Sequence, residues 1–132
     1  MKLEHIGIAV KELEASNKLF EILFDSPHYK TEEVASEGVT TSFFQLGNTK
    51  VELLEASSES SAIAKFIAKK GEGVHHLAFE VQDIDFEIDR LSKAGFQLIH
   101  ETPKEGADNK RIAFLHPKST NGVLIELCQE KG

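Results

Sequence analysis

One short pattern occurs twice in this chain and limits the folds that it can adopt. The stretches His5-Ile6-Gly7-Ile8-Ala9-Val10 and His76-Leu77-Ala78-Phe79-Glu80-Val81 both begin with a histidine and alternate larger apolar residues with small or polar ones. A period of two predicts a β-strand with two different faces. Small side chains beside a histidine leave open space in front of the imidazole, which a binding site needs and a packed core does not. We therefore expect two related modules, each with a histidine at a site.

The end of each half of the chain also repeats. Val51-Glu52-Leu53-Leu54 closes the first half and Leu124-Ile125-Glu126-Leu127 closes the second, each with one glutamate among aliphatic residues. Between these strands and the histidine strands, both halves contain a charged stretch with helical spacing. The chain is thus interpreted as an internal duplication within one domain.

The remaining hydrophobic patterns predict the other elements. In the first half they indicate a helix over 11–24 with Leu13, Leu19, Phe20 and Leu23 on its apolar face, then strands over 29–34, 39–46 and 50–54. The pair Gly47-Asn48 predicts a hairpin turn between the last two of these strands. In the second half they indicate a helix over 84–94 between Asp83 and Gly95, strands over 96–101, 111–116 and 123–128, and a polar loop over 103–110. We expect a single domain over 1–132: module one over 1–56, a linker and short helix over 57–72, and module two over 73–130.

Composition excludes several classes of protein. The chain has 132 residues, of which 40% are hydrophobic and 28% are charged, which fits one globular domain. Its net charge of −7 argues against general nucleic-acid binding, which requires a basic surface. It contains one cysteine, so no internal disulfide can form, and it shows no signal peptide and no apolar run of about 18 residues. We expect a cytoplasmic protein that does not enter the membrane.

The repeated histidines and glutamates suggest one shared metal site. Imidazole nitrogen and carboxylate oxygen suit a hard or borderline divalent cation, and two carboxylates neutralise its charge. The candidate ligands are His5, Glu52, His76 and Glu126. His76 is preferred to His75 because it matches His5 in register. A single histidine on a strand is usually a structural residue, so the metal interpretation depends on the four residues recurring at matched positions.

The same segments resemble a known superfamily. HIGIAV and HHLAFEV, with KVELLE and VLIEL, are similar to the vicinal oxygen chelate superfamily of glyoxalases, bleomycin resistance proteins and dioxygenases. The stretches LGNTKVELL, GADNKRIAFLHPK and GVLIEL resemble its methylmalonyl-CoA epimerase family. The resemblance implies an α+β fold of two paired βαβββ modules whose curved mixed sheets enclose a metal site. It also implies a homodimer and a divalent ion held by the same four residues, with cobalt expected and nickel, manganese or zinc as alternatives.

The reaction implied by the resemblance is epimerisation of methylmalonyl-CoA at C2. Inversion there requires a proton acceptor on one face of the carbon and a donor on the other. Glu126 matches the metal-bound acid/base of the family. Thr40 and Thr41 stand where a related type of enzyme has a glutamate, so the nearest carboxylate, Glu37, is the candidate partner on the opposite face. The coenzyme A phosphates would contact the basic residues Lys104, Lys110, Arg111 and Lys118.

Two other functions remain open from the sequence. A glyoxalase I-like lactoylglutathione lyase would use the same four ligands on a glutathione adduct. A non-catalytic small-molecule binding or resistance protein is the second alternative, although such relatives generally lack the full ligand set. The lysine-rich loop favours a coenzyme A thioester.

Overall fold

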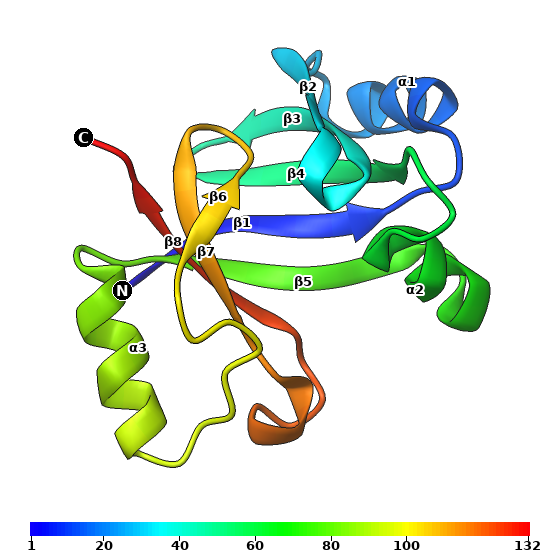
Figure 1. Cartoon of the computed structure of the whole chain (residues 1–132). Helices are drawn as coiled ribbons and strands as arrows, with labels where there is room; N and C mark the ends of the chain where they lie inside the picture. Colours follow the sequence, from blue (N-terminus) through cyan, green and yellow to red (C-terminus); the bar gives the residue numbers. More distant parts are fainter. The chain divides into compact units, whose positions relative to one another are not determined.

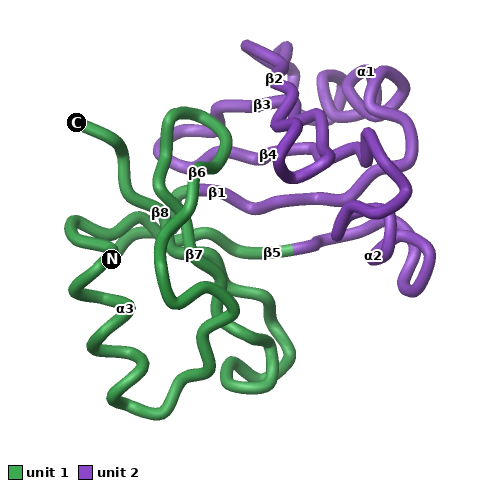
Figure 2. Tube along the Cα trace, viewed as in Figure 1, with its two compact units in different colours: residues 1–4, 76–132 green, residues 5–75 purple.

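The computed structural model describes residues 1–132, and the chain forms two compact units. Unit 2 contains residues 5–75, and unit 1 contains residues 1–4 together with residues 76–132 (Figure 2). Along the chain, the order strand, helix, three strands occurs twice, which confirms the predicted α+β fold of two βαβββ modules. An additional short helix, α2 (Ala62–Lys70), lies between the two repeats.

Unit 2 contains four strands in the order β2-β3-β4-β1. Its elements are β1 (Lys2–Ala9, in this unit from His5 on), α1 (Leu13–Phe24), β2 (Lys30–Val34), the 3-10 turn η1 (Ala35–Glu37), β3 (Val39–Leu46), β4 (Thr49–Ala56) and α2. Strands β1 and β4 run parallel, whereas β2, β3 and β4 are antiparallel neighbours. Gly47, with a φ of 61°, makes the β3–β4 hairpin turn that the Gly-Asn pair predicted.

The two faces of these four strands are covered differently. Helix α1 covers the face that carries Phe44, Val51 and Leu53, beside β3 and β4 (Figure 1). Helix α2 packs on one end of the opposite face, where Ile63 joins Ala9, Val39 and Leu54. The rest of that opposite face carries the Phe43 ring and polar side chains such as Glu52 and Lys30.

The predicted apolar face of α1 is partly wrong. Leu13 is buried and Phe20 packs in the core, but Leu19 and Leu23 are 63% and 68% exposed. The helix instead turns its aromatic stripe inward, with the Phe20 and Phe24 rings 5.5 Å apart and Phe24 edge-on to Phe44. Aromatic rings bury more apolar area than leucine side chains, so the aromatic stripe faces the sheet.

Unit 1 repeats the arrangement with strands in the order β5-β8-β7-β6. Its elements are β5 (Gly73–Glu80, in this unit from His76 on), α3 (Ile84–Lys93), β6 (Lys104–Gly106), β7 (Lys110–Leu115), the 3-10 turn η2 (Pro117–Ser119) and β8 (Ile125–Glu130). The Asp83 side chain accepts a hydrogen bond from the Phe86 N–H, and Gly95 has a φ of 98°, so the predicted start and end of α3 are confirmed.

The strand predicted over 96–101 is wrong, and so is the loop over 103–110. Only Leu98 forms a β-bridge, to Leu115, and regular pairing begins at Lys104, where β6 joins β7. Pro103 has no N–H to donate, so it fits the boundary between the irregular segment and β6. The polar composition of residues 103–110 suggested a loop, but residues 104–106 form the edge strand β6 and the residues after them form its turn.

None of the helices in this fold is both long enough and apolar enough to span a bilayer.

Candidate functional site

His5 and Glu52 form a buried contact in unit 2. The parallel register of β1 and β4 pairs Gly7 with Glu52 and His5 with Lys50, so all four point to the face opposite α1. His5 Nδ1 lies 3.1 Å from Glu52 Oε2, and both side chains are about 5% exposed. A carboxylate this deeply buried needs a compensating positive charge or hydrogen bonds, which makes the pair a candidate for metal binding.

Unit 1 contains the same arrangement. Strands β5 and β8 are parallel and pair Ala78 with Glu126, two residues after His76. His76 Nε2 lies 3.3 Å from Glu126 Oε1, and both side chains are below 10% exposed. The Phe114 ring stands edge-on to the His76 ring, with centroids 5.8 Å apart. Each unit thus has one buried imidazole and one buried carboxylate in contact.

The small residues on the histidine strands explain why these contacts can form. Glu52 is the cross-strand neighbour of Gly7, and Glu126 is the neighbour of Ala78. The histidine is therefore diagonal to the glutamate, and a large side chain at the intervening position would fill the space in which they meet. The sequence signal of small neighbours thus corresponds to the geometry in both units.

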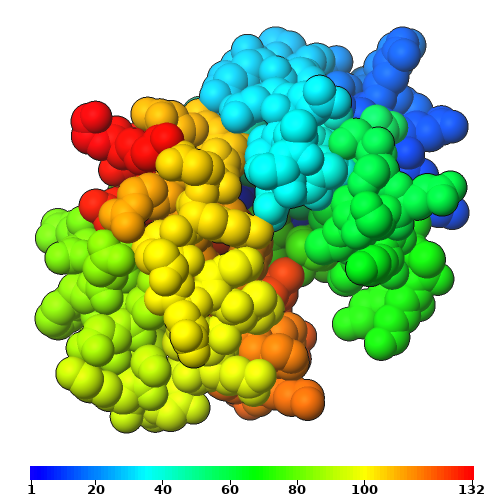
Figure 3. All heavy atoms as spheres, in the orientation of Figure 1, coloured from blue at the N-terminus to red at the C-terminus, as the bar shows by residue number.

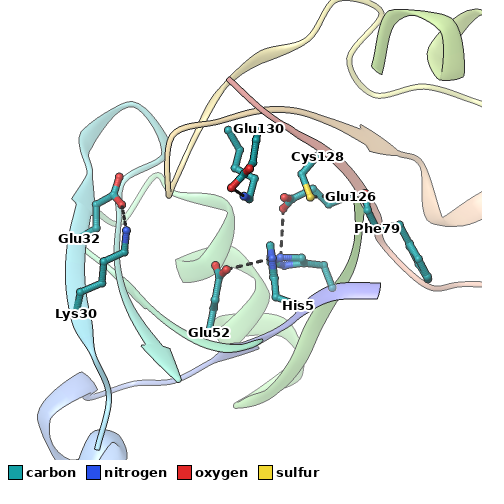
Figure 4. Close-up of polar contacts among 10 residues, drawn as sticks. His5, Lys30, Glu32, Glu52, Phe79, Glu126, Cys128 and Glu130 are labelled. Atoms are coloured by element: carbon teal, nitrogen blue, oxygen red, sulfur yellow. Dashed lines mark hydrogen bonds and ion pairs between the residues drawn. The ribbon is translucent and has the colours of Figure 1, made fainter. Parts of the chain in front are cut away.

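The donor atoms of the two pairs suit a divalent cation. His5 with Glu52, and His76 with Glu126, belong to groups of side chains whose chemistry and spacing could hold a metal ion. Imidazole nitrogen and carboxylate oxygen are the ligands of many zinc, cobalt, nickel and manganese sites. Figure 4 shows the contact between His5 and Glu52 as a dashed line.

The other histidines make local contacts. His28 contacts Glu21, His100 Nδ1 accepts a hydrogen bond from the Phe114 N–H, and His116 Nδ1 accepts one from the Lys118 N–H. Burial lowers the pKa of His75 to about 4, and its ring lies edge-on to Phe66 with centroids 5.0 Å apart. These four histidines therefore have structural roles.

Burial also determines the protonation of the single cysteine, Cys128. Cys128 is on β8, two residues beyond Glu126, and is fully buried. Burial raises the pKa of the Cys128 thiol, and the carboxylates of Glu126 and Glu4 raise it further. The thiol is therefore held in its protonated form and donates to the Phe79 carbonyl at 3.6 Å.

The basic residues predicted to contact coenzyme A do not form one cluster. Lys110 and Arg111 are successive residues of β7 and point to opposite faces. Lys110 is buried, with Nζ 3.3 Å from Glu130 Oε1, whereas Arg111 contacts Asp85 of α3. Lys118 is exposed in η2, and Lys104 is half-buried in β6.

The second predicted acid/base, Glu37, lies in η1 and is half-buried. Gly38 follows it with a φ of 65°, and a Cβ at Gly38 would lie 2.9 Å from Ser58 Oγ and from Ser61 Cβ. The turn that carries Glu37 is therefore fixed against the segment before α2.

Two lysines that sequence reasoning missed share the face of Glu52. The register pairs Phe43 of β3 with Glu52 and with Lys30 of β2, and it pairs Gln45 with Lys50. Lys30 and Lys50 therefore point to the same side as Glu52. Alternation along β2 and β4 was the available signal, but the pairing of the strands was needed to use it.

Comparison with known proteins identifies the family. Residues 4–114 match the model of the Glyoxalase/Bleomycin resistance protein/Dioxygenase superfamily, and the chain belongs to this superfamily. It is 41% identical over 130 residues to an ethylmalonyl-CoA/methylmalonyl-CoA epimerase of Cereibacter sphaeroides, covering 97% of both chains. It is 41% identical over 127 residues to a mitochondrial methylmalonyl-CoA epimerase of Dictyostelium discoideum, covering 96% of this chain and 76% of the relative.

A solved structure agrees with this assignment. A methylmalonyl-CoA epimerase in complex with methylmalonyl-CoA and NH4+ superposes with a TM-score of 0.94 at 34% identity, covering 99% of this chain and 95% of the other. The two proteins are therefore similar in sequence as well as in fold.

Proposed function

We propose that this chain is an isomerase that interconverts the R and S forms of methylmalonyl-CoA at C2. The observation that carries the proposal is the buried His–Glu contact, which recurs in both modules of a chain that is 41% identical to a named epimerase across nearly its whole length. The proton at C2 is acidified by the adjacent thioester carbonyl, so a site that stabilises the resulting enolate can catalyse its exchange.

We further propose that His5, Glu52, His76 and Glu126 together hold one divalent ion. The proposal is supported by their donor atoms and by the burial of all four side chains, since a bound cation would stabilise two buried carboxylates. Cobalt is the proposed ion, with nickel, manganese and zinc as alternatives. Such an ion, when bound, supplies Lewis-acid stabilisation of the negative charge that develops on the substrate oxygens.

Glu126 is the proposed acid/base on one face of C2. It contacts His76, and as the second residue of β8 it is paired with Ala78 of β5 and Phe114 of β7, so its carboxylate has a fixed direction. Glu37 is the proposed partner on the opposite face. Its support is the fixed turn in which it lies, since a proton donor must keep a constant distance from the carbon.

Lys104, Lys110, Arg111 and Lys118 are the basic residues proposed for coenzyme A in the second module. The exposure of Lys118 and the partial exposure of Lys104 support these two, because a phosphate must be reached from solvent. Lys110 and Arg111 already contact carboxylates, at 3.3 Å from Glu130 and from Asp85 respectively. A homodimer in the cytoplasm remains the prediction for the assembly and the compartment.

The named relatives favour epimerisation over a lactoylglutathione lyase or a resistance protein. One of them is named for both ethylmalonyl-CoA and methylmalonyl-CoA, so the length of the acyl branch is a variable to be measured. Both compounds present the same carboxylate and thioester, and they differ by one methylene group in the branch. A difference of this size changes discrimination by a factor of about 10 to 200 at most.

Deuterium exchange tests the reaction directly. Purified protein and methylmalonyl-CoA are mixed in heavy water, and loss of the C2 proton signal is followed by NMR, with and without a metal chelator. We expect the C2 proton signal to disappear rapidly with the protein present. The chelator should stop this exchange, and added cobalt should restore it. Exchange no faster than without protein would disprove the function. Faster turnover of a glutathione hemithioacetal under the same conditions would favour the lyase.

A further inference from the structure

A row of side chains crosses unit 2 from the candidate metal ligand to the edge strand. The row contains Gly7, Glu52, Phe43 and Lys30, which are successive cross-strand partners on β1, β4, β3 and β2. Because cross-strand partners point to the same side, Glu52 and Lys30 flank the Phe43 ring on one face. Two strand spacings, or roughly 10 Å, separate the Cα atoms of Lys30 and Glu52.

The Lys30 ammonium is held over this face. Its Nζ lies 4.7 Å from the centroid of the Phe43 ring and 3.7 Å from Glu32 Oε1. The side chain is 38% exposed, so the ammonium is both oriented and open to solvent. Figure 4 shows Lys30 and Glu32 side by side on β2, with Glu52 projecting from the same sheet. The cyan atoms of this part of the chain lie at the molecular surface in Figure 3.

A second cation and an aromatic ring lie near Lys30. Lys50 belongs to the neighbouring row, two residues before Glu52 on β4, and it is half-buried. The Tyr29 ring is 48% exposed, and its centroid is 5.9 Å from that of Phe43. Glu32 offsets part of the positive charge, and its side chain is 35% exposed. Lys30, Lys50, Tyr29 and Phe43 are called the β2–β4 subsite below.

We propose that the β2–β4 subsite binds the phosphate-bearing part of the coenzyme A thioester, with Lys30 as its main anion contact. The proposal rests on the proposed function and adds a binding surface in the first module. The chain has a net charge of −7, so a substrate with several phosphate charges is repelled by most of its surface. A lysine held on the face of a metal-ligand candidate provides a local positive charge where such a substrate must lie.

Truncated substrates provide the test. KM and kcat are measured for wild type and Lys30→Ala with methylmalonyl-CoA and with methylmalonyl-pantetheine, which has the same acyl thioester and no phosphate. We expect Lys30→Ala to raise KM for the coenzyme A thioester roughly tenfold, as the loss of one charge-assisted contact would, with kcat nearly unchanged. The KM for the pantetheine thioester should be the same in both proteins.

Lys18→Ala is the matched control. The substitution removes the same charge from the same unit. Lys18, however, lies on α1, which covers the other face of the sheet. Its KM for methylmalonyl-CoA should equal that of wild type. An unchanged KM in Lys30→Ala, or an equal rise with both substrates, would overturn the proposal.

Direct binding separates this proposal from the proposed function. Calorimetric titration of free coenzyme A into wild type, Lys30→Ala and Lys30→Ala/Lys50→Ala does not depend on turnover. Affinity should fall in the single variant, fall further in the double variant, and become less sensitive to salt in both. A wild-type protein that binds coenzyme A but exchanges no C2 proton would disprove the epimerase alone. Equal coenzyme A affinity in all three proteins would disprove the subsite alone.

Discussion

The Glu21 carboxylate accepts two hydrogen bonds from the same residue, His28. Its Oε2 atom lies 3.1 Å from the His28 backbone nitrogen and 2.8 Å from His28 Nδ1. These contacts connect the last turns of α1 to the segment that leads into β2. The side-chain and backbone hydrogen bonds from His28 lower the pKa of Glu21 below its ordinary value of 4.5.

The contact predicts an acid-dependent loss of stability. Because the folded-state pKa of Glu21 is depressed, its contribution is present above pH 4.5 and is lost as the pH falls through the lower folded value. We expect Glu21→Gln to lower Tm near neutral pH, and the difference from wild type to shrink in acid, where both side chains are uncharged. Glu14→Gln, on the exposed surface of α1, loses only a solvent-exposed ion pair with Lys18 and should change Tm little at any pH. A Tm difference independent of pH would contradict the assignment.

Glu126→Gln should abolish proton exchange at C2. The amide keeps the size of the side chain but cannot accept the proton, and we expect a loss of at least about 100-fold in rate. The measurement is the loss of the C2 proton signal in heavy water. Glu130→Gln, on the same strand but exposed, should retain activity. Near-normal turnover in Glu126→Gln would exclude the acid/base role.

Cys128 should not react with thiol reagents in the folded protein. The thiolate is the reactive form, and burial raises the pKa of this thiol while excluding the reagent. We expect no colour with Ellman's reagent at pH 8 in native buffer and one equivalent of thiol in denaturing urea. Reaction in native buffer at the rate of free cysteine would show that β8 opens readily.

Gly106→Ala should destabilise the β6–β7 hairpin. A Cβ at this position would lie 2.7 Å from Ile112 Cγ2 and 2.9 Å from its Cδ1, so the Ile112 side chain or the backbone around it must shift. Overpacking of this kind costs about 1–3 kcal/mol, measured as a lower free energy of unfolding in urea. In a double-mutant cycle, Ile112→Ala should cost less in the Gly106→Ala background than alone. Gly132→Ala, where nothing lies nearby, is the control.

Local sequence signals predicted most elements of the fold. The cap at Asp83 and the glycine after α3 gave that helix its bounds, and the Gly47-Asn48 pair gave the β3–β4 hairpin. What could not be predicted depended on contacts between distant segments. Helix α1 has two candidate apolar stripes, and only packing on Phe44 selects the aromatic one. The segment 96–101 has strand composition but pairs only at Leu98.

The candidate site shows the same division. Parity along the strands was enough to prefer His76 over His75 and to expect Gly7 and Ala78 beside the histidines. Closeness in sequence did not show which basic residues lie together in the fold. Lys110 and Arg111 are adjacent in sequence but lie on opposite faces of β7. The position of Lys30 beside Phe43 depends on the antiparallel pairing of β2 and β3 across the η1 turn. Composition carries no information on such a register.

In both modules, the first strand forms its parallel pair with the last, as the His76–Glu126 contact shows for β5 and β8. During synthesis, the second carboxylate therefore reaches its imidazole only after β8 has left the ribosome. An ion that requires both carboxylates would be bound weakly by nascent chains that lack β8.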